Sequence, residues 1–287
     1  MRYNDNARLD SGQVAGGGGG AGGRIAVGGG VGTMILLFIL SQLFGIDLTG
    51  LAGGGQAESR PDSNAYAHCQ TGQDIQQNRE CRWVAYTNSI QDYWSQAYSG
   101  YQMTQTRLFT NQVSTACGTA TSAVGPFYCP ADSRVYLDET FFDSMLRQLG
   151  GQKSDAAEAY VIAHEYGHHI QNLTGVMEQV QRQGQTTGPD SPATRLELQA
   201  DCYAGVWFKH VVNDPQGPIS QVTQEDLNNA LDAARIVGDD SIQQRTQGRV
   251  NPDAWTHGSS EQRKRWLATG YNTGDPNACN TFASRQV

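Results

Sequence analysis

The pattern of apolar and polar positions beyond residue 67 is mostly helical. Apolar side chains recur there every three or four residues in several stretches, which is the spacing that gives an α-helix one buried face. The predicted helices are residues 82–101, 140–149, 154–173, 194–211, 223–238 and one within 255–271. Residues 134–138 alternate instead, and alternation predicts a β-strand. The pattern therefore predicts a mainly α fold with a small β-sheet, which is an α+β domain.

The first 66 residues differ in composition from the rest. They begin polar and glycine-rich, and such a segment gains too little from burial to offset the entropy of ordering it. An uncharged stretch follows, centred on the apolar run 34–40, and it is long enough for a membrane-spanning helix. A cleaved signal peptide and a buried core helix are the alternatives. The predicted division is a disordered leader at 1–24, a transmembrane anchor at 25–47, a flexible linker at 48–66 and a folded domain at 67–287.

The charge of the chain bears on its partners and its placement. The formal net charge is -8 and the isoelectric point is near 5.2, whereas proteins that bind nucleic acids usually present a basic face. No nucleic-acid partner is therefore expected. Arg2, Arg8 and Arg24 precede the apolar run, and positive residues favour the cytoplasmic side of a membrane. The sequence predicts a single-pass membrane protein whose C-terminal domain lies on the periplasmic or extracellular side.

The cysteine count is even, which suggests disulfides in an exported chain. None of the six lies in a C-x-x-C pair, so a thiolate zinc site or a thioredoxin-type redox motif is not expected. Two pairs are each twelve positions apart and could close local loops, which leaves one distant pair. The proposed pairs are Cys69–Cys81, Cys117–Cys129 and Cys202–Cys279. Buried free thiols in a cytosolic protein are the alternative.

The most informative local pattern is HEYGH at residues 164–168. Four residues are about one helical turn, so His164 and His168 project from one face and can bind one metal ion. Glu165 lies beside them without needing to be a ligand, and it can take a proton from metal-bound water. The neighbouring residues are apolar, so the helix is expected to be buried, and buried histidines need a partner. A hydrogen-bonded pair of core histidines is the alternative reading.

A third ligand is expected from the next predicted helix. A catalytic zinc site usually has three protein ligands and an open position. Glu197 and Asp201 are four residues apart on a mostly apolar helix, so they share a face. Glu197 is predicted to bind zinc, and Asp201 to accept a hydrogen bond from the far ring nitrogen of His164. The alternative is that these two carboxylates belong to a solvent-exposed acidic turn and bind nothing.

Several separate segments of the sequence resemble the putative neutral zinc metallopeptidase family of membrane-anchored bacterial proteins. The resembling segments are residues 125–130, 135–138, 164–169, 197–202, 238–240 and 256–263. They occur in the family's order, and the likeness extends over about residues 67–285. The glycine-rich start followed by one apolar span is also similar to that family.

The resemblance implies a gluzincin-like zincin fold, with two zinc histidines on one helix and a zinc glutamate on the next. Residues 256–263 also look like a segment of the Ste24/HtpX-type peptidases, in which an arginine follows a histidine by six positions. That likeness implies that His257 steadies the oxyanion of the reaction and that Arg263 pairs with buried carboxylates. Gly258 stands where the other group usually has proline. His257 as a capping residue at a helix entry is the alternative.

The predicted function is that of a zinc metalloendopeptidase, with Zn²⁺ as cofactor and a peptide or protein as substrate. The strand 135–138 is expected, by analogy with other zinc peptidases, to be the edge along which the substrate lies. His68, His169 and His210 are expected to have no role in the site. The alternatives are a non-catalytic envelope protein stabilised by zinc and an amidase that acts on cell-wall peptides. The sequence leaves the oligomeric state open.

Overall fold

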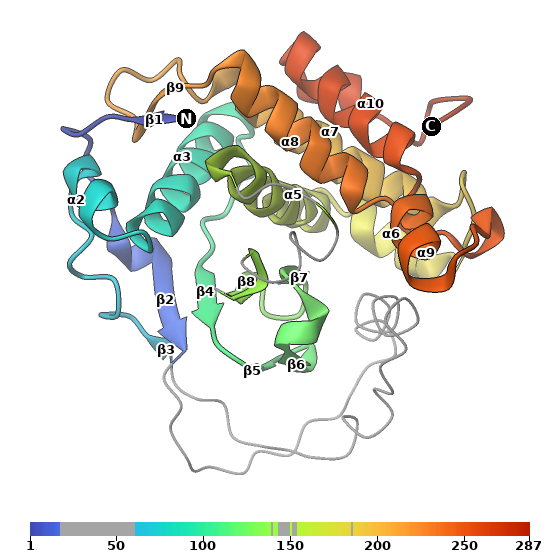
Figure 1. Ribbon diagram of the computed structural model, residues 1–287, viewed down its shortest axis with the longest axis horizontal. Helices are drawn as coiled ribbons and strands as arrows, with labels where there is room; N and C mark the ends of the chain where they lie inside the picture. The colour runs from blue at the N-terminus through green and yellow to red at the C-terminus, as the bar shows by residue number, and fades with distance from the viewer. Residues whose placement is uncertain (18–60, 139, 143–149, 151–153, 185) are drawn as a thin grey trace.

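A computed structural model describes residues 1–17, 61–138, 140–142, 150, 154–184 and 186–287 (Figure 1). The α-helices are α2 (Gly72–Gln77), α3 (Cys81–Ala97), α5 (Asp155–Leu173), α6 (Val176–Arg182), α7 (Pro192–His210), α8 (Gln224–Ile236), α9 (Asp239–Gln247) and α10 (Ser260–Thr273). The strands are β1 (Arg2–Tyr3), β2 (Val14–Gly17), β3 (Pro61–Asp62), β4 (Thr106–Phe109), β5 (Gln112–Thr115), β6 (Gly118–Thr121), β7 (Phe127–Cys129), β8 (Arg134–Asp138) and β9 (Ile219–Gln221).

Helix α5 lies at the centre of the fold. It packs against β7 and β8 on one side and against α7 and α8 on the other, and α10 covers α7 (Figure 1). Its residues from Ala156 to Gln171 are almost all buried, because both sides of the helix face other elements. The observed α+β architecture, rich in helix with small sheets, agrees with the class predicted from the sequence.

Most predicted helices are present, and their ends follow the capping residues. The Ser154 side chain accepts a hydrogen bond from the backbone N–H of Ala157 at the start of α5, as its position suggests. Helix α7 begins two residues earlier than predicted, because Ser191 caps it and proline at the first helical position loses no hydrogen bond. Gly238 ends the predicted 223–238 helix, but it also precedes α9, which was not predicted. Residues 143–149 of the predicted 140–149 helix lie outside the described residues.

The main sheet has five strands in the order β3-β2-β4-β8-β7. β4 is parallel to β2 and β8, and the two outer pairs are antiparallel. The predicted strand at 134–138 is therefore confirmed as β8, but its predicted place at the sheet edge is wrong. β8 is paired on both sides, and β7 is the strand at that edge. The three-residue β7 and the four-residue β4 are too short to give a periodic signal.

The N-terminal residues belong to the folded domain. Val14 and Ala15 are fully buried in β2, and Ala7 and Leu9 are nearly so. The Tyr3 hydroxyl donates to Asp155 at the start of α5 over 2.9 Å. The prediction of a disordered leader is therefore wrong for residues 1–17. Composition suggested disorder because few apolar residues occur there, but their partners come from distant parts of the chain.

The pairing of β2 restricts how the chain can meet a membrane. Gly17 in β2 is paired with Pro61 in β3, and β2 also lies parallel to β4. A single crossing by residues 25–47 would place β2 and β4 on opposite sides of the bilayer, so the strand pairing contradicts the predicted single-pass arrangement. The predicted span itself, and most of the 48–66 linker, lie outside the described residues. Among the described residues, no helix has the length and apolarity to cross a membrane.

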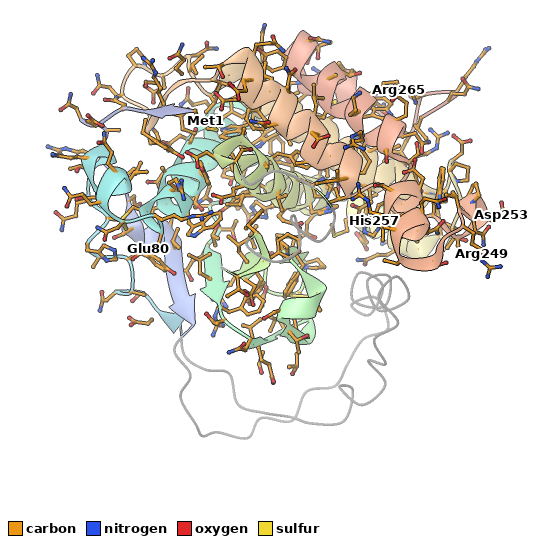
Figure 2. All side chains as sticks on the ribbon, in the orientation of Figure 1. Met1, Glu80, Arg249, Asp253, His257 and Arg265 are labelled. Carbon is orange, nitrogen blue, oxygen red and sulfur yellow. A yellow bond between two sulfur atoms is a disulfide. The ribbon has the colours of Figure 1, made fainter. Side chains whose placement is uncertain are left out.

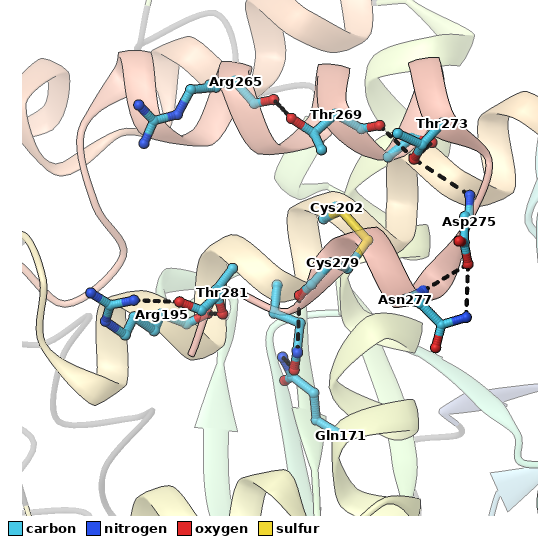
Figure 3. Close-up of a disulfide and its surroundings, with 12 residues drawn as sticks. Gln171, Arg195, Cys202, Arg265, Thr269, Thr273, Asp275, Asn277, Cys279 and Thr281 are labelled. Carbon is cyan, nitrogen blue, oxygen red and sulfur yellow. Dashed lines mark hydrogen bonds between the residues drawn. A yellow bond between two sulfur atoms is a disulfide. The ribbon is translucent and has the colours of Figure 1, made fainter. Parts of the chain in front are cut away.

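The three predicted disulfides are all present, as Cys69–Cys81, Cys117–Cys129 and Cys202–Cys279. The first two close local loops, and the third joins α7 to the C-terminal segment (Figure 3). Disulfides of this number are typical of proteins that fold in an oxidizing environment outside the cytoplasm.

Glycines allow α10 to lie directly on α7. A Cβ atom on Gly270 of α10 would overlap the backbone carbonyl of Cys202, and one on Gly205 of α7 would overlap that of Leu267. The two backbones are therefore in contact at this crossing. The contact fixes α10, and with it Arg263, relative to α7.

Replacing Gly270 with alanine is expected to destabilise the protein, although alanine favours helices. The added methyl must push α10 away from α7, and overpacking of this kind costs about 1–3 kcal/mol. Urea denaturation measures the change, with Thr269→Ala on the same helix as the control. A Gly270→Ala protein as stable as the wild type would contradict this account of the crossing.

Candidate metal centre

The side chains of His164 and His168 lie one turn apart on α5, and their ring centroids are 4.7 Å apart. Gly167 between them faces Ala200 of α7, and a Cβ atom on Gly167 would lie 2.9 Å from the Ala200 Cα. Because glycine permits this close approach, α7 brings Glu197 up to the two imidazoles. The HEYGH glycine therefore has a packing role in building the site.

The three predicted ligands converge in the interior. Glu197 Oε2 lies 3.2 Å from His164 Nε2, and Glu197 Oε1 lies 3.5 Å from His168 Nε2. One ligand atom from each residue lies within 4.8 Å of the other two, and all three side chains are buried. Two imidazoles and a carboxylate are a usual donor set for a catalytic zinc ion. These residues can therefore hold one zinc ion with a position left for water or substrate.

A second cluster with metal-binding atoms does not have the right chemistry. His68 lies close to Cys69 and Cys81, but these two cysteines form a disulfide. Their sulfurs are therefore not the thiolates that bind zinc. Within the described part of the chain, the centre at His164 is the one suited to a metal.

Asp201 orients His164 through its other ring nitrogen. Asp201 Oδ1 lies 2.8 Å from His164 Nδ1, which leaves Nε2 directed toward Glu197. Burial lowers the pKa of His164, but the attraction of Asp201 and the hydrogen bonds to Asp201 and Glu197 outweigh it and raise the pKa to about 10. A metal ion must displace that proton, so binding at this site is expected to weaken as the pH falls.

Arg263 of α10 completes the buried carboxylate site. Its Nε donates to Asp201 Oδ2 over 2.8 Å and its Nη2 donates to Asp201 Oδ1 over 2.9 Å. The predicted pairing of Arg263 with a buried carboxylate is therefore observed. Sequence reasoning missed Tyr160, whose hydroxyl donates to Asp201 over 2.6 Å. Its place one turn before His164 on the same helix face was the available signal.

Glu165 is buried beside the proposed ligands with one oxygen unpaired. Its Oε2 has no hydrogen-bond partner among the described residues. Burial raises the pKa of Glu165, and the nearby imidazoles of His164 and His168 act against this rise. A buried carboxylate oxygen without a partner is costly, so this oxygen is available to accept a hydrogen bond from a group that enters the site.

Comparison with known proteins also points to zinc. The chain matches, over residues 2–282, the family described as putative neutral zinc metallopeptidase. The chain belongs to this family. The cofactor of such a zinc metallopeptidase is Zn²⁺, and the donor set at His164 fits it.

Relatives of the chain occur in Mycobacterium and Escherichia. An uncharacterized protein of Mycobacterium tuberculosis, Rv2575, is 46% identical over 226 residues, which cover 77% of this chain and 76% of the relative. The uncharacterized protein YpfJ of Escherichia coli K12 is 37% identical over 283 residues, covering 92% of this chain and 90% of the relative. No solved structure matches the chain.

His257 is held by Asp239 of α9, close enough to the centre for its charge to interact with Glu197. Its Nδ1 lies 3.3 Å from Asp239 Oδ1, and its backbone N–H donates to Asp239 Oδ2 over 2.7 Å. Figure 2 labels His257 and shows it close to the ribbon of α9. Burial lowers the pKa of His257, but the charges of Glu197 and Asp239 outweigh it and raise the pKa. The alternative reading of His257 as a helix cap is wrong, because Ser259 accepts the capping hydrogen bond from Gln262 at the start of α10.

The histidines expected to have no role lie outside the centre. His169 is adjacent in sequence to His168, but its ring nitrogens face the Tyr128 hydroxyl and the Gln102 carbonyl. His68 pairs with Glu80 near the surface. Adjacent residues on a helix point about 100° apart, which explains why His169 cannot join the site.

Proposed function

We propose that the protein is a zinc-dependent endopeptidase in which His164, His168 and Glu197 hold the zinc ion and Glu165 is the general base. The observation that carries the proposal is the convergence of three buried donor side chains beside a carboxylate with an unpaired oxygen. A purely structural zinc site would need no such carboxylate. The non-catalytic alternative is therefore disfavoured.

The reaction class is hydrolysis of a peptide bond. When bound, zinc polarises the scissile carbonyl and makes the attacking water more acidic. Glu165 accepts a proton from that water and then delivers it to the leaving amine. His257 donates a hydrogen bond to the oxygen that becomes negative, and its raised pKa favours the form able to do so.

Two further residues act on the ligands in this proposal. Asp201 keeps His164 in the tautomer that presents Nε2 to the metal, and Arg263 keeps Asp201 ionised. Burial raises the pKa of Asp201, but Arg263 and His164 outweigh it and hold that pKa at about 2. The carboxylate therefore stays charged at any pH at which the enzyme would work.

We also place the whole described protein outside the cytoplasm. The three disulfides favour an oxidizing environment, and β2 shares a sheet with β4, which supports placing residues 1–17 on the same side as the rest. Membrane association through residues 25–47 stays a prediction from the sequence.

The proposal is tested by metal analysis of the full chain. We expect one zinc per molecule in the wild type and loss of zinc in Glu197→Ala, because two imidazoles alone bind zinc weakly. Glu178→Ala on the exposed face of α6 is the matched control. Zinc-free wild-type protein, or full zinc content in Glu197→Ala, would overturn the ligand assignment.

The substrate class is tested separately. Removal of zinc with a chelator should abolish hydrolysis of casein, and zinc should restore it. Peptidoglycan fragments tested beside casein distinguish a peptidase from a cell-wall amidase, because both attack an amide bond. Hydrolysis of the fragments alone would favour the amidase.

A further inference from the structure

The second proposed zinc histidine has an unusual partner. His168 Nδ1 lies 2.8 Å from Gln171 Oε1, one turn further along α5. His164 is oriented by a charged carboxylate that is paired with an arginine, whereas His168 is oriented by a neutral amide. A neutral amide has no net charge to attract the imidazole, so it can orient His168 only through the direction of its hydrogen bond. The amide of Gln171 must therefore itself be held in one orientation by other groups.

A chain of hydrogen bonds fixes the orientation of Gln171. Its Nε2 donates to the Leu196 backbone carbonyl over 2.6 Å and to Gln199 Oε1 over 3.1 Å. A carbonyl can only accept, so the amide nitrogen of Gln171 must face Leu196 and its oxygen must face His168. A flipped Gln171 would place its oxygen against two acceptors inside the protein, where such contacts are costly.

The series of hydrogen bonds continues in the same donor-to-acceptor direction, from Gln199 to the C-terminal segment. Gln199 Nε2 donates to the backbone carbonyl of Cys279 over 3.1 Å, which directs Gln199 Oε1 toward Gln171. Cys279 is bonded to Cys202 on α7, one turn beyond Gln199's position (Figure 3). Gln171 and Cys279 are fully buried and Gln199 nearly so, so water does not readily replace these bonds.

We propose that Gln171 and Gln199 are positioning residues that hold His168 in the tautomer able to bind zinc, and that the Cys202–Cys279 disulfide anchors their far end. The proposal rests on the proposed function, in that His168 must be a zinc ligand. Because Gln171 accepts from His168 Nδ1–H, the Nε2 lone pair is left free and directed toward Glu197. The disulfide keeps the Cys279 carbonyl where Gln199 needs it.

The proposal links the oxidation state of the protein to its metal site. Reduction of Cys202–Cys279 would remove the covalent anchor of the Cys279 carbonyl and weaken its hydrogen bond with Gln199, although Thr281 would stay hydrogen-bonded to Arg195. Gln171 would still donate to Leu196, so the site would be loosened and not destroyed. Zinc binding is therefore expected to be tighter in the oxidized protein.

The test measures the zinc dissociation constant of the full chain by competition with a chelating dye. Gln171→Met removes the acceptor for His168 at nearly constant volume and should weaken zinc binding about 10- to 100-fold. Gln199→Met should have a smaller effect, because Leu196 still holds Gln171. Gln91→Met is the matched control, since Gln91 is an equally buried glutamine on α3 that binds other partners.

A spectroscopic readout separates positioning from a general loss of structure. Cobalt bound in place of zinc reports ligand geometry through its visible absorption. We expect the cobalt spectrum to change in Gln171→Met and to stay as in the wild type in Gln91→Met. Unchanged zinc affinity and cobalt spectrum in Gln171→Met would overturn the proposal, whereas a wild type that binds no zinc would instead overturn the proposed function.

The disulfide is tested with a pair of double variants. Cys202→Ala with Cys279→Ala should weaken zinc binding. Cys69→Ala with Cys81→Ala removes a disulfide that, within the described residues, makes no contact with either positioning glutamine, and it should not weaken zinc binding. Equal zinc affinity in the two double variants would overturn the role of the disulfide. If the first double variant fails to fold, mild reduction of the folded wild type followed by the same dye competition gives the comparison.

Discussion

Replacing Glu165 with glutamine is expected to abolish peptide hydrolysis while leaving the zinc content unchanged. Glutamine has nearly the same shape but cannot accept the proton of the attacking water. A general base of this kind contributes about 100- to 10,000-fold to the rate. Glu165 is not among the three converging donor residues, so the metal should stay bound. The measurement is zinc content together with kcat on a casein-derived peptide.

Two comparisons complete that experiment. His164→Ala should lose both zinc and activity, because His164 is a proposed metal ligand. Glu165→Gln should lose activity alone, because Glu165 is the proposed base. Glu178→Gln, on the surface, should change neither. A Glu165→Gln enzyme that cleaves the peptide at the wild-type rate would refute the assignment of the base.

Replacing Arg263 with methionine is expected to destabilise the fold strongly. Arg263 donates two hydrogen bonds to Asp201, which is completely buried. Without the guanidinium, only Tyr160 and His164 among the described residues still contact the buried carboxylate, and removing one partner of a buried ion pair costs up to about 3–5 kcal/mol. Urea denaturation of the zinc-free protein measures the effect, with exposed Arg265→Met on the same helix as the control.

The pH dependence of that loss has a definite sign. Asp201 has a folded-state pKa of about 2, which is lowered from its usual range. Its stabilising contribution is therefore present above the unfolded-state pKa of about 3.9 and is lost as the pH falls through the folded-state value. The stability gap between wild type and Arg263→Met should be constant near neutral pH and should narrow below about pH 4. A gap that widened toward acid would contradict the assignment.

The candidate metal site was largely predictable from sequence because its members are related by local geometry. His164 and His168 are one turn apart, as are Glu197 and Asp201, and apolar neighbours indicated that both helices are buried. Spacing within a helix determines which side chains share a face. One contact between the two helices then suffices to bring the histidine pair and the carboxylate pair together.

Features that depend on distant partners could not be predicted in this way. β8 was predicted to lie at a sheet edge, and nothing in its own residues indicates the neighbours that make it internal. Gln171 gave no signal, because a glutamine orients a histidine only when Leu196 and Gln199 fix its direction. Polar networks of this kind are specified by tertiary structure and not by periodicity.

The pairing of β2 with β3 has a practical consequence for producing the protein. A recombinant fragment that starts after residue 60 would discard buried Val14 and Ala15 and expose one edge of β4. Such an exposed edge invites aggregation. Because Gly17 and Pro61 are antiparallel partners, a short hairpin turn can join them directly in place of residues 18–60. That shortened chain keeps the whole sheet and is the better starting material for crystallisation.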